Sequence, residues 1–145
     1  MRLGSALVRR VAVAAWLMIG GVVAPAVAGT VVVPVRLPLT GTRDTQVEAA
    51  VIRRLGQLRD QAPERGTLVL RFDAVDGEPP GGSDFGRALE LARFLVDERL
   101  AGVKTVAWLP EGATGHAVLV ALACDEIAMP ADAVLGPATA PGERP

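Results

Sequence analysis

Runs of apolar residues alternate with stretches of helical periodicity along most of the chain. The first run, residues 30–39, is rich in valine and predicts a β-strand, which Pro34 and Pro38 restrict to a sheet edge or to strand ends. Apolar residues then recur at helical spacing and predict a helix that ends near Gln61, before the next proline and glycine. Its apolar face consists of Val47, Val51, Leu55 and Leu58.

The middle of the chain predicts a second strand and a second helix. Residues 67–72 form a short strand-like run, and residues 73–82 form a loop rich in glycine and proline. Either Ser83 or Asp84 can cap the following helix, because a short side-chain oxygen accepts the free amide hydrogens of a first helical turn. The expected apolar face of this helix is Phe85, Ala88, Leu89, Ala92 and Leu95.

The last third predicts another strand, helix and strand. A β-branched run with Thr105, Val106 and Trp108 leads into a glycine-rich turn at residues 112–115. An apolar helix follows and is expected to end at Asp125 and Glu126, before a short strand at residues 127–129 and a loop to Gly136. This alternation predicts parallel βαβ units with right-handed crossovers, and therefore an α/β layered fold.

The first 28 residues have the pattern of a secretory leader. Three arginines precede an apolar stretch at residues 11–23, and Ala26 and Ala28 form a small-x-small cleavage signal. We therefore expect export to the periplasm or cell envelope, with residues 29–136 as the folded domain and residues 137–145 as a tail. An uncleaved anchor is the alternative, although the apolar run is short for a membrane span.

Charge and cysteine content exclude several classes of function. The formal net charge is −1 and three positive charges lie in the leader, so the remaining domain is acidic and we expect no nucleic-acid partner. Cys124 is the only cysteine, which excludes an intramolecular disulfide. Its place on an apolar helix favours an inert buried thiol over a nucleophile paired with His116. With a single histidine we expect no metal site.

The stretch from residue 104 to 136 resembles the ClpP-class serine peptidases, most closely the NfeD and signal-peptide-peptidase A branch. The resemblance lies in a small-residue turn that opens an apolar helix, followed by Asp125-Glu126-Ile127, Met129 and a closing Leu-Gly at Gly136. It implies a ClpP/crotonase-like fold with a mainly parallel sheet, and no cofactor.

The resemblance also assigns the positions of a catalytic site. It places the nucleophilic serine of the family at Gly115, and it equates the loop containing Gly81 and Gly82, or alternatively Gly77, with an oxyanion-binding turn. The general-base lysine of the branch has no counterpart, since no lysine follows Lys104. Thr114 and His116 are the nearest side chains with suitable chemistry, but residues two apart on a helix do not face each other.

We therefore expect a catalytically inactive homologue that acts as a binding or assembly module of the cell envelope. Its expected partners are a peptide, an envelope protein or further copies of itself, and membrane association is compatible with the leader. One alternative is an active membrane-associated serine-type peptidase that cleaves apolar segments of exported proteins. The other is a small-ligand binder with a vacant pocket between residues 80–82 and the helix start near Gly115. Acid/base chemistry at Asp125 and Glu126 is a further possibility, for which a solvated helix end is the competing interpretation.

Overall fold

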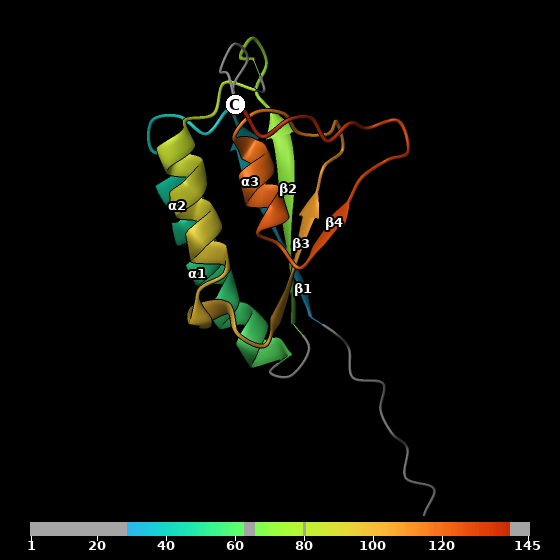
Figure 1. Ribbon diagram of the computed structural model, residues 1–145. Coiled ribbons are helices and arrows are strands. Elements are labelled where there is room, and N and C mark those ends of the chain that lie inside the picture. Colours follow the sequence, from blue (N-terminus) through green and yellow to red (C-terminus); the bar gives the residue numbers. More distant parts are fainter. Residues whose placement is uncertain (1–28, 63–65, 80, 140–145) are drawn as a thin grey trace, which may run out of the picture.

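The computed structural model describes residues 29–62, 66–79 and 81–139. These form an α/β fold in which a layer of helices packs on one sheet (Figure 1). Four strands make a single sheet in the order β1-β2-β3-β4, and all neighbouring pairs are parallel. The elements are β1 (Thr30–Leu37), α1 (Arg43–Gln61), β2 (Gly66–Ala74), α2 (Phe85–Leu95), the short 3₁₀ helix η1 (Glu98–Leu100), β3 (Val103–Trp108), α3 (Ala117–Leu122) and β4 (Glu126–Ala128).

The parallel α/β architecture predicted from the sequence is confirmed. Each pair of adjacent strands is joined through a helix, and the three helices lie on the same side of the sheet (Figure 1). Strand β1 is at the edge, where Pro34 is tolerated because an edge strand leaves one row of amide positions unpaired. Helix α1 ends at Gln61, as its periodicity predicts.

The core lies between the helices and the face of the sheet that they cover. The predicted apolar face of α1, formed by Val47, Val51, Leu55 and Leu58, is buried. It packs with alternate residues of the strands, including Val33, Val35, Leu68, Leu70 and Ala107. Asp44 is buried at the start of α1 and accepts a hydrogen bond of 3.0 Å from Nη1 of Arg87, which ties α1 to α2.

The buried face of α2 differs from the predicted one. Ala88 and Leu95 are buried as expected, but Phe85 is exposed, and Leu91 and Phe94 are buried in its place. Helix α2 contacts both α1 and α3, so the residues that face these two helices are buried and Phe85 is not. Asp84 is the capping residue, since its side chain accepts from the amide of Arg87.

Helix α3 is shorter than predicted. It ends at Leu122, so Asp125 and Glu126 do not terminate it, and β4 begins one residue earlier than expected, at Glu126. The chain turns early because the side chain of Asp125 binds strand β3 directly.

The face of the sheet opposite the helices carries no helix or strand from the described ranges 29–62, 66–79 and 81–139. Strand residues that point this way are exposed or half-buried, whereas most of their neighbours toward the helices are buried; the exceptions on β1 to β3, Val31, Ala74 and Val103, lie at strand ends. We call this surface the open face. It consists of Thr30, Val32, Pro34 and Arg36 on β1, Thr67, Val69, Arg71 and Asp73 on β2, Lys104, Val106 and Trp108 on β3, and Glu126 and Ala128 on β4.

No helix within the described part of the chain is both long and apolar enough to cross a membrane. The predicted leader, residues 1–28, lies outside the described residues.

Candidate functional site

Two glycine-containing segments that are far apart in the sequence meet at the carboxyl edge of the sheet. Gly115 follows strand β3, is buried and has a φ of 64°. A Cβ built on Gly115 would lie against the carbonyl oxygen of Gly81, 3.1 Å from its carbonyl carbon and 3.2 Å from its Cα. The two segments that the resemblance equates with nucleophile and oxyanion turn are therefore neighbours, and Gly77 is elsewhere, on an open turn with no atom near its Cβ position.

The same contact leaves no room for a side chain at position 115. The three atoms nearest to the Cβ position all belong to the backbone of Gly81, so a residue other than glycine would have to displace the main chain. The left-handed φ adds a further cost for any L-residue with a Cβ. The pocket expected between residues 80–82 and the helix start includes residue 80, which lies outside the described residues, and so it stays a prediction; beside Gly115 itself, the space is taken by the backbone of Gly81.

Two backbone amides of this edge, those of Gly115 and Gly82, already have acceptors within the chain. The amide of Gly115 donates to the carbonyl of Pro137 over 2.9 Å, and the amide of Gly82 donates to Pro79 over 3.0 Å. An oxyanion hole requires N–H groups that point at the developing charge. Helix α3 has only six residues, so its dipole offers little compensation.

The segment after β4 closes this edge by running beside the turn. Ala113 forms a parallel bridge with Leu135, with hydrogen bonds from its amide to Val134 and from the amide of Gly136 to its carbonyl. The turn is glycine-rich for a steric reason, since a Cβ on Gly112 would collide with the carbonyl oxygen of Val134. The backbone amide and carbonyl of Ala113, which could pair with another strand, are therefore already bonded within the chain.

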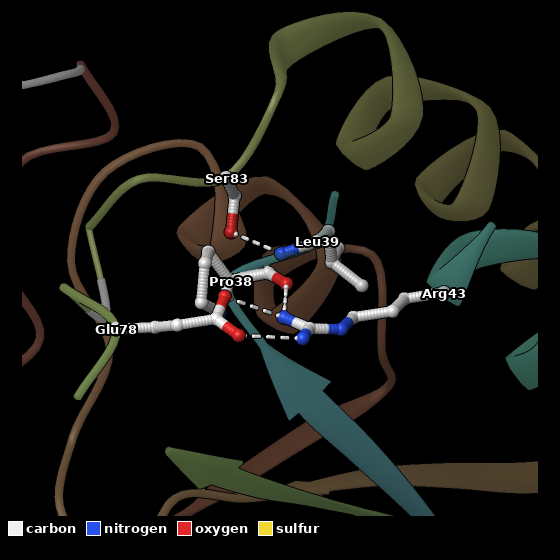
Figure 2. Close-up of polar contacts among 5 residues, drawn as sticks. All are labelled: Pro38, Leu39, Arg43, Glu78 and Ser83. Atoms are coloured by element: carbon white, nitrogen blue, oxygen red, sulfur yellow. Dashed lines mark hydrogen bonds and ion pairs between the residues drawn. The ribbon is translucent and has the colours of Figure 1, made fainter. Parts of the chain in front are cut away.

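The loop that carries Gly81 is fastened to the end of β1 (Figure 2). Arg43 binds the carboxylate of Glu78 through both terminal nitrogens, at 2.9 and 2.7 Å, and also donates to the carbonyl of Pro38. The hydrogen bond from Arg43 lowers the pKa of Glu78. Ser83, a predicted cap, instead accepts from the amide of Leu39 over 2.9 Å. The sequence offered no signal for these pairs, which join residues 35 and 44 positions apart.

His116 is buried at the start of α3 and is directed toward α2. Its Nδ1 lies 2.9 Å from the carbonyl oxygen of Ser83, which can only accept, so Nδ1 carries the proton in this contact. The ring packs edge-to-face with Phe85 at a centroid distance of 5.3 Å. These contacts make His116 a residue that joins the start of α3 to the start of α2.

Thr114 lines a cavity of about 70 Å³ with Leu37, Phe72 and Glu111. Its methyl group lies close to Gly136, where a Cβ would be only 2.7 Å away. Ligand pockets usually enclose about 300–1,000 Å³. The cavity beside Thr114 is therefore too small to hold a peptide or a typical cofactor.

Two further side chains, those of Cys124 and Lys104, are of types that take part in catalysis. Here Cys124 is unreactive, and Lys104 lies away from this edge. The pKa of the Cys124 thiol is raised to about 12, mainly by burial and secondly by the negative charge of Asp125. Cys124 is therefore a poor nucleophile, in line with the inert thiol predicted from its apolar surroundings in the sequence. Lys104 is at the amino end of β3 and pairs with Glu126 on the open face. It is therefore at the opposite end of its strand from the turn that leads to Gly115.

Asp125 has a structural role that the sequence did not reveal. Its carboxylate accepts from the amide and hydroxyl of Thr105, at 2.7 and 2.8 Å, and its own amide donates back to that hydroxyl. The backbone hydrogen bond from Thr105, reinforced by the hydroxyl, lowers the pKa of Asp125. This reciprocal pair holds the start of β4 against β3. Asp125 is exposed, as the solvated interpretation predicts, but it does not end a helix, because α3 stops at Leu122.

In the described residues, no group of three or more histidine, cysteine, aspartate and glutamate side chains is arranged to hold a metal ion. No protein-family model matches the chain, and neither a curated protein nor a solved structure is significantly similar to it.

Proposed function

We propose that the protein is a non-catalytic homologue of the ClpP-class serine peptidases, of the NfeD type, that serves as a binding or assembly module of the cell envelope. Three features support the ClpP/crotonase-like assignment: the parallel βαβ sheet, the short apolar helix after a glycine turn, and the proximity of that turn to the Gly81 loop. The leader-like sequence of residues 1–28 supports a place in the envelope.

The observation that carries the proposal is the backbone contact between Gly115 and Gly81. A nucleophile at position 115 needs space for a Cβ and an oxygen beyond it, and the carbonyl of Gly81 already occupies that space. The neighbouring amides of Gly82 and Gly115 are bound to Pro79 and Pro137. Position 115 therefore lacks the reacting group and the room for it, and the amides of Gly82 and Gly115 are not free to stabilise a transition state.

The lysine base of the branch has no counterpart at this edge. A serine or threonine hydroxyl is a weak nucleophile at neutral pH unless a general base is within hydrogen-bond reach. Lys104 is engaged with Glu126 at the far end of β3. Replacement of Gly115 by serine is consequently expected to yield no peptidase.

A hydrolysis assay tests the proposal. The purified protein and the Gly115→Ser variant are incubated with casein and with apolar peptides, and new amino termini are quantified against a heat-denatured control. We expect both proteins to match the control. If wild type releases peptides and either Thr114→Ala or Cys124→Ala abolishes the release, the protein is an active peptidase and the altered residue is its nucleophile.

A further inference from the structure

The open face presents two apolar rows that cross the sheet perpendicular to its strands. Strand register places Val32, Val69 and Val106 side by side in one row, which ends at Glu126 on β4. The next row toward the carboxyl edge contains Pro34, Arg71, Trp108 and Ala128. The center of this face is therefore mainly apolar.

A parallel sheet with one bare face is unusual, because parallel sheets occur almost only where both faces are covered. The side chain of Val32 is 49% exposed, and Val69, Val106 and Trp108 are only partly buried. Covering these rows would remove apolar surface from water at a gain of roughly 25 cal/mol per Å². The open face thus has the character of a surface that binds a partner.

Most charges on the open face are already paired with a neighbour on the same face. Arg71 binds Asp73 at 2.9 Å, and Lys104 binds Glu126. Burial of the apolar rows would consequently leave these groups with their partners, which limits the penalty for removing charges from water. Among the charged residues of the open face, only Arg36, next to the last residue of β1, has no ionic partner in the described part of the chain.

We propose that the open face binds the open face of a second copy of this chain. A twofold axis parallel to the strands and between β2 and β3 places Val69 over the partner's Val106 and Arg71 over the partner's Trp108, each pair occurring twice. Arginine over an indole ring is a favourable cation–π pair. This arrangement sets no two like charges opposite each other, so the face is complementary to itself.

The interface specifies a surface for the assembly role proposed above, but it rests on the sheet and not on the loss of catalysis. A finding of peptidase activity would leave it standing, and a monomeric protein would leave the inactive carboxyl edge standing. The two proposals therefore fail separately.

Sedimentation of the purified full chain over a concentration series tests the interface with a matched pair of variants. Val32 and Ile52 are both aliphatic and are 49% and 51% exposed, but Val32 is on the open face and Ile52 is on the outer side of α1. The proposed arrangement places Val32 over the partner's Glu126, so Val32→Asp sets like charges opposite each other. We expect wild type and Ile52→Asp to dimerise equally, and Val32→Asp to dissociate at least tenfold more readily. Circular dichroism and thermal melting verify that each variant is folded.

Two results would overturn the proposal. One is a wild-type protein that remains monomeric at every concentration. The other is equal association of Val32→Asp and Ile52→Asp, which would assign self-association to a different surface, including residues 1–28.

The orientation has its own test. Arg71→Gln removes the cation that is placed over the partner's Trp108, whereas Arg53→Gln removes an exposed cation from α1. Arg71→Gln should weaken dimerisation several-fold relative to Arg53→Gln, in line with about 0.5–2 kcal/mol for a cation–π pair. Equal dimer affinities would exclude the proposed arrangement of the two sheets.

Discussion

The carboxyl edge of the sheet and its open face differ in how far their groups are engaged within the chain. At the carboxyl edge, where ligands usually bind in open α/β sheets, the chain bonds its own amides and places Gly81 against Gly115. On the open face, the valine row is left without a covering layer by the described residues. This difference is the basis of our proposal that binding takes place on the open face, even though the sequence directs attention to the glycine turns.

The largest expected effect separates the two faces of a single strand. Leu70 is fully buried under the helices, and its neighbour Val69 is on the open face. Leu70→Asp should abolish soluble, folded protein, since an unpaired buried carboxylate costs several kcal/mol against a total stability of about 5–15 kcal/mol. Val69→Asp should remain folded and become monomeric. Soluble yield and thermal melting of both variants provide the measurement, and similar yields would show that both faces are buried or both are open.

The next effect isolates the contact at the carboxyl edge. Gly115 and Gly77 both have positive φ values, 64° and 80°, but only Gly115 has backbone atoms at its Cβ position. Gly77→Ala should cost about 1–2 kcal/mol for the left-handed conformation. Gly115→Ala should cost about 1–3 kcal/mol more, because the added methyl group displaces the Gly81 backbone. Urea unfolding of the two variants measures the difference, and equal losses would mean that position 115 is open.

A smaller loss is expected where β3 meets β4. Thr105→Val removes the hydroxyl that both donates to and accepts from Asp125, with an expected cost of about 1–3 kcal/mol. Thr67→Val, on the open face of the neighbouring strand, is the matched control and should be close to neutral. Urea unfolding distinguishes the two variants. An unchanged stability for Thr105→Val would show that β4 is held by its backbone alone.

The smallest effect is a dependence of stability on pH. Hydrogen bonds from Thr105 lower the pKa of Asp125 in the folded state, so the unfolded state binds the proton more tightly. The stabilisation from Asp125 is therefore complete above the ordinary aspartate pKa of about 4 and is lost as the pH falls through the lowered folded value. Asp125→Asn should reduce this acid sensitivity, whereas Asp132→Asn, in an exposed turn, should resemble wild type in denaturation measured at several pH values. Parallel pH profiles for wild type and Asp125→Asn would contradict this account of the carboxylate.

The sequence predicted the elements with strong local signals and missed those that depend on contacts. Val47, Val51, Leu55 and Leu58 define α1 by their spacing alone, and Pro34 marks β1 as an edge strand. The end of α3 was predicted too late, because an apolar helix pattern contains no information on the bond between Asp125 and Thr105.

The same limit applies to the candidate site. The sequence singled out both Gly115 and the Pro-Gly-Gly loop, yet it could not show that their backbones touch or that Pro137 takes the amide of Gly115. Steric exclusion depends on the position of main-chain atoms from a distant segment. That position is set by tertiary contacts such as the pair between Arg43 and Glu78, which no local pattern encodes.

The central claim, that the carboxyl edge holds no activated nucleophile, is tested most directly by intact-mass analysis of the purified protein after exposure to a serine-directed fluorophosphonate. A hydroxyl without a base does not react readily with such a probe. We predict an unchanged mass for wild type, and the same result for Gly115→Ser. A stoichiometric adduct on native wild-type protein that disappears on heat denaturation, mapped to Thr114 or any other residue of this edge, would contradict the claim.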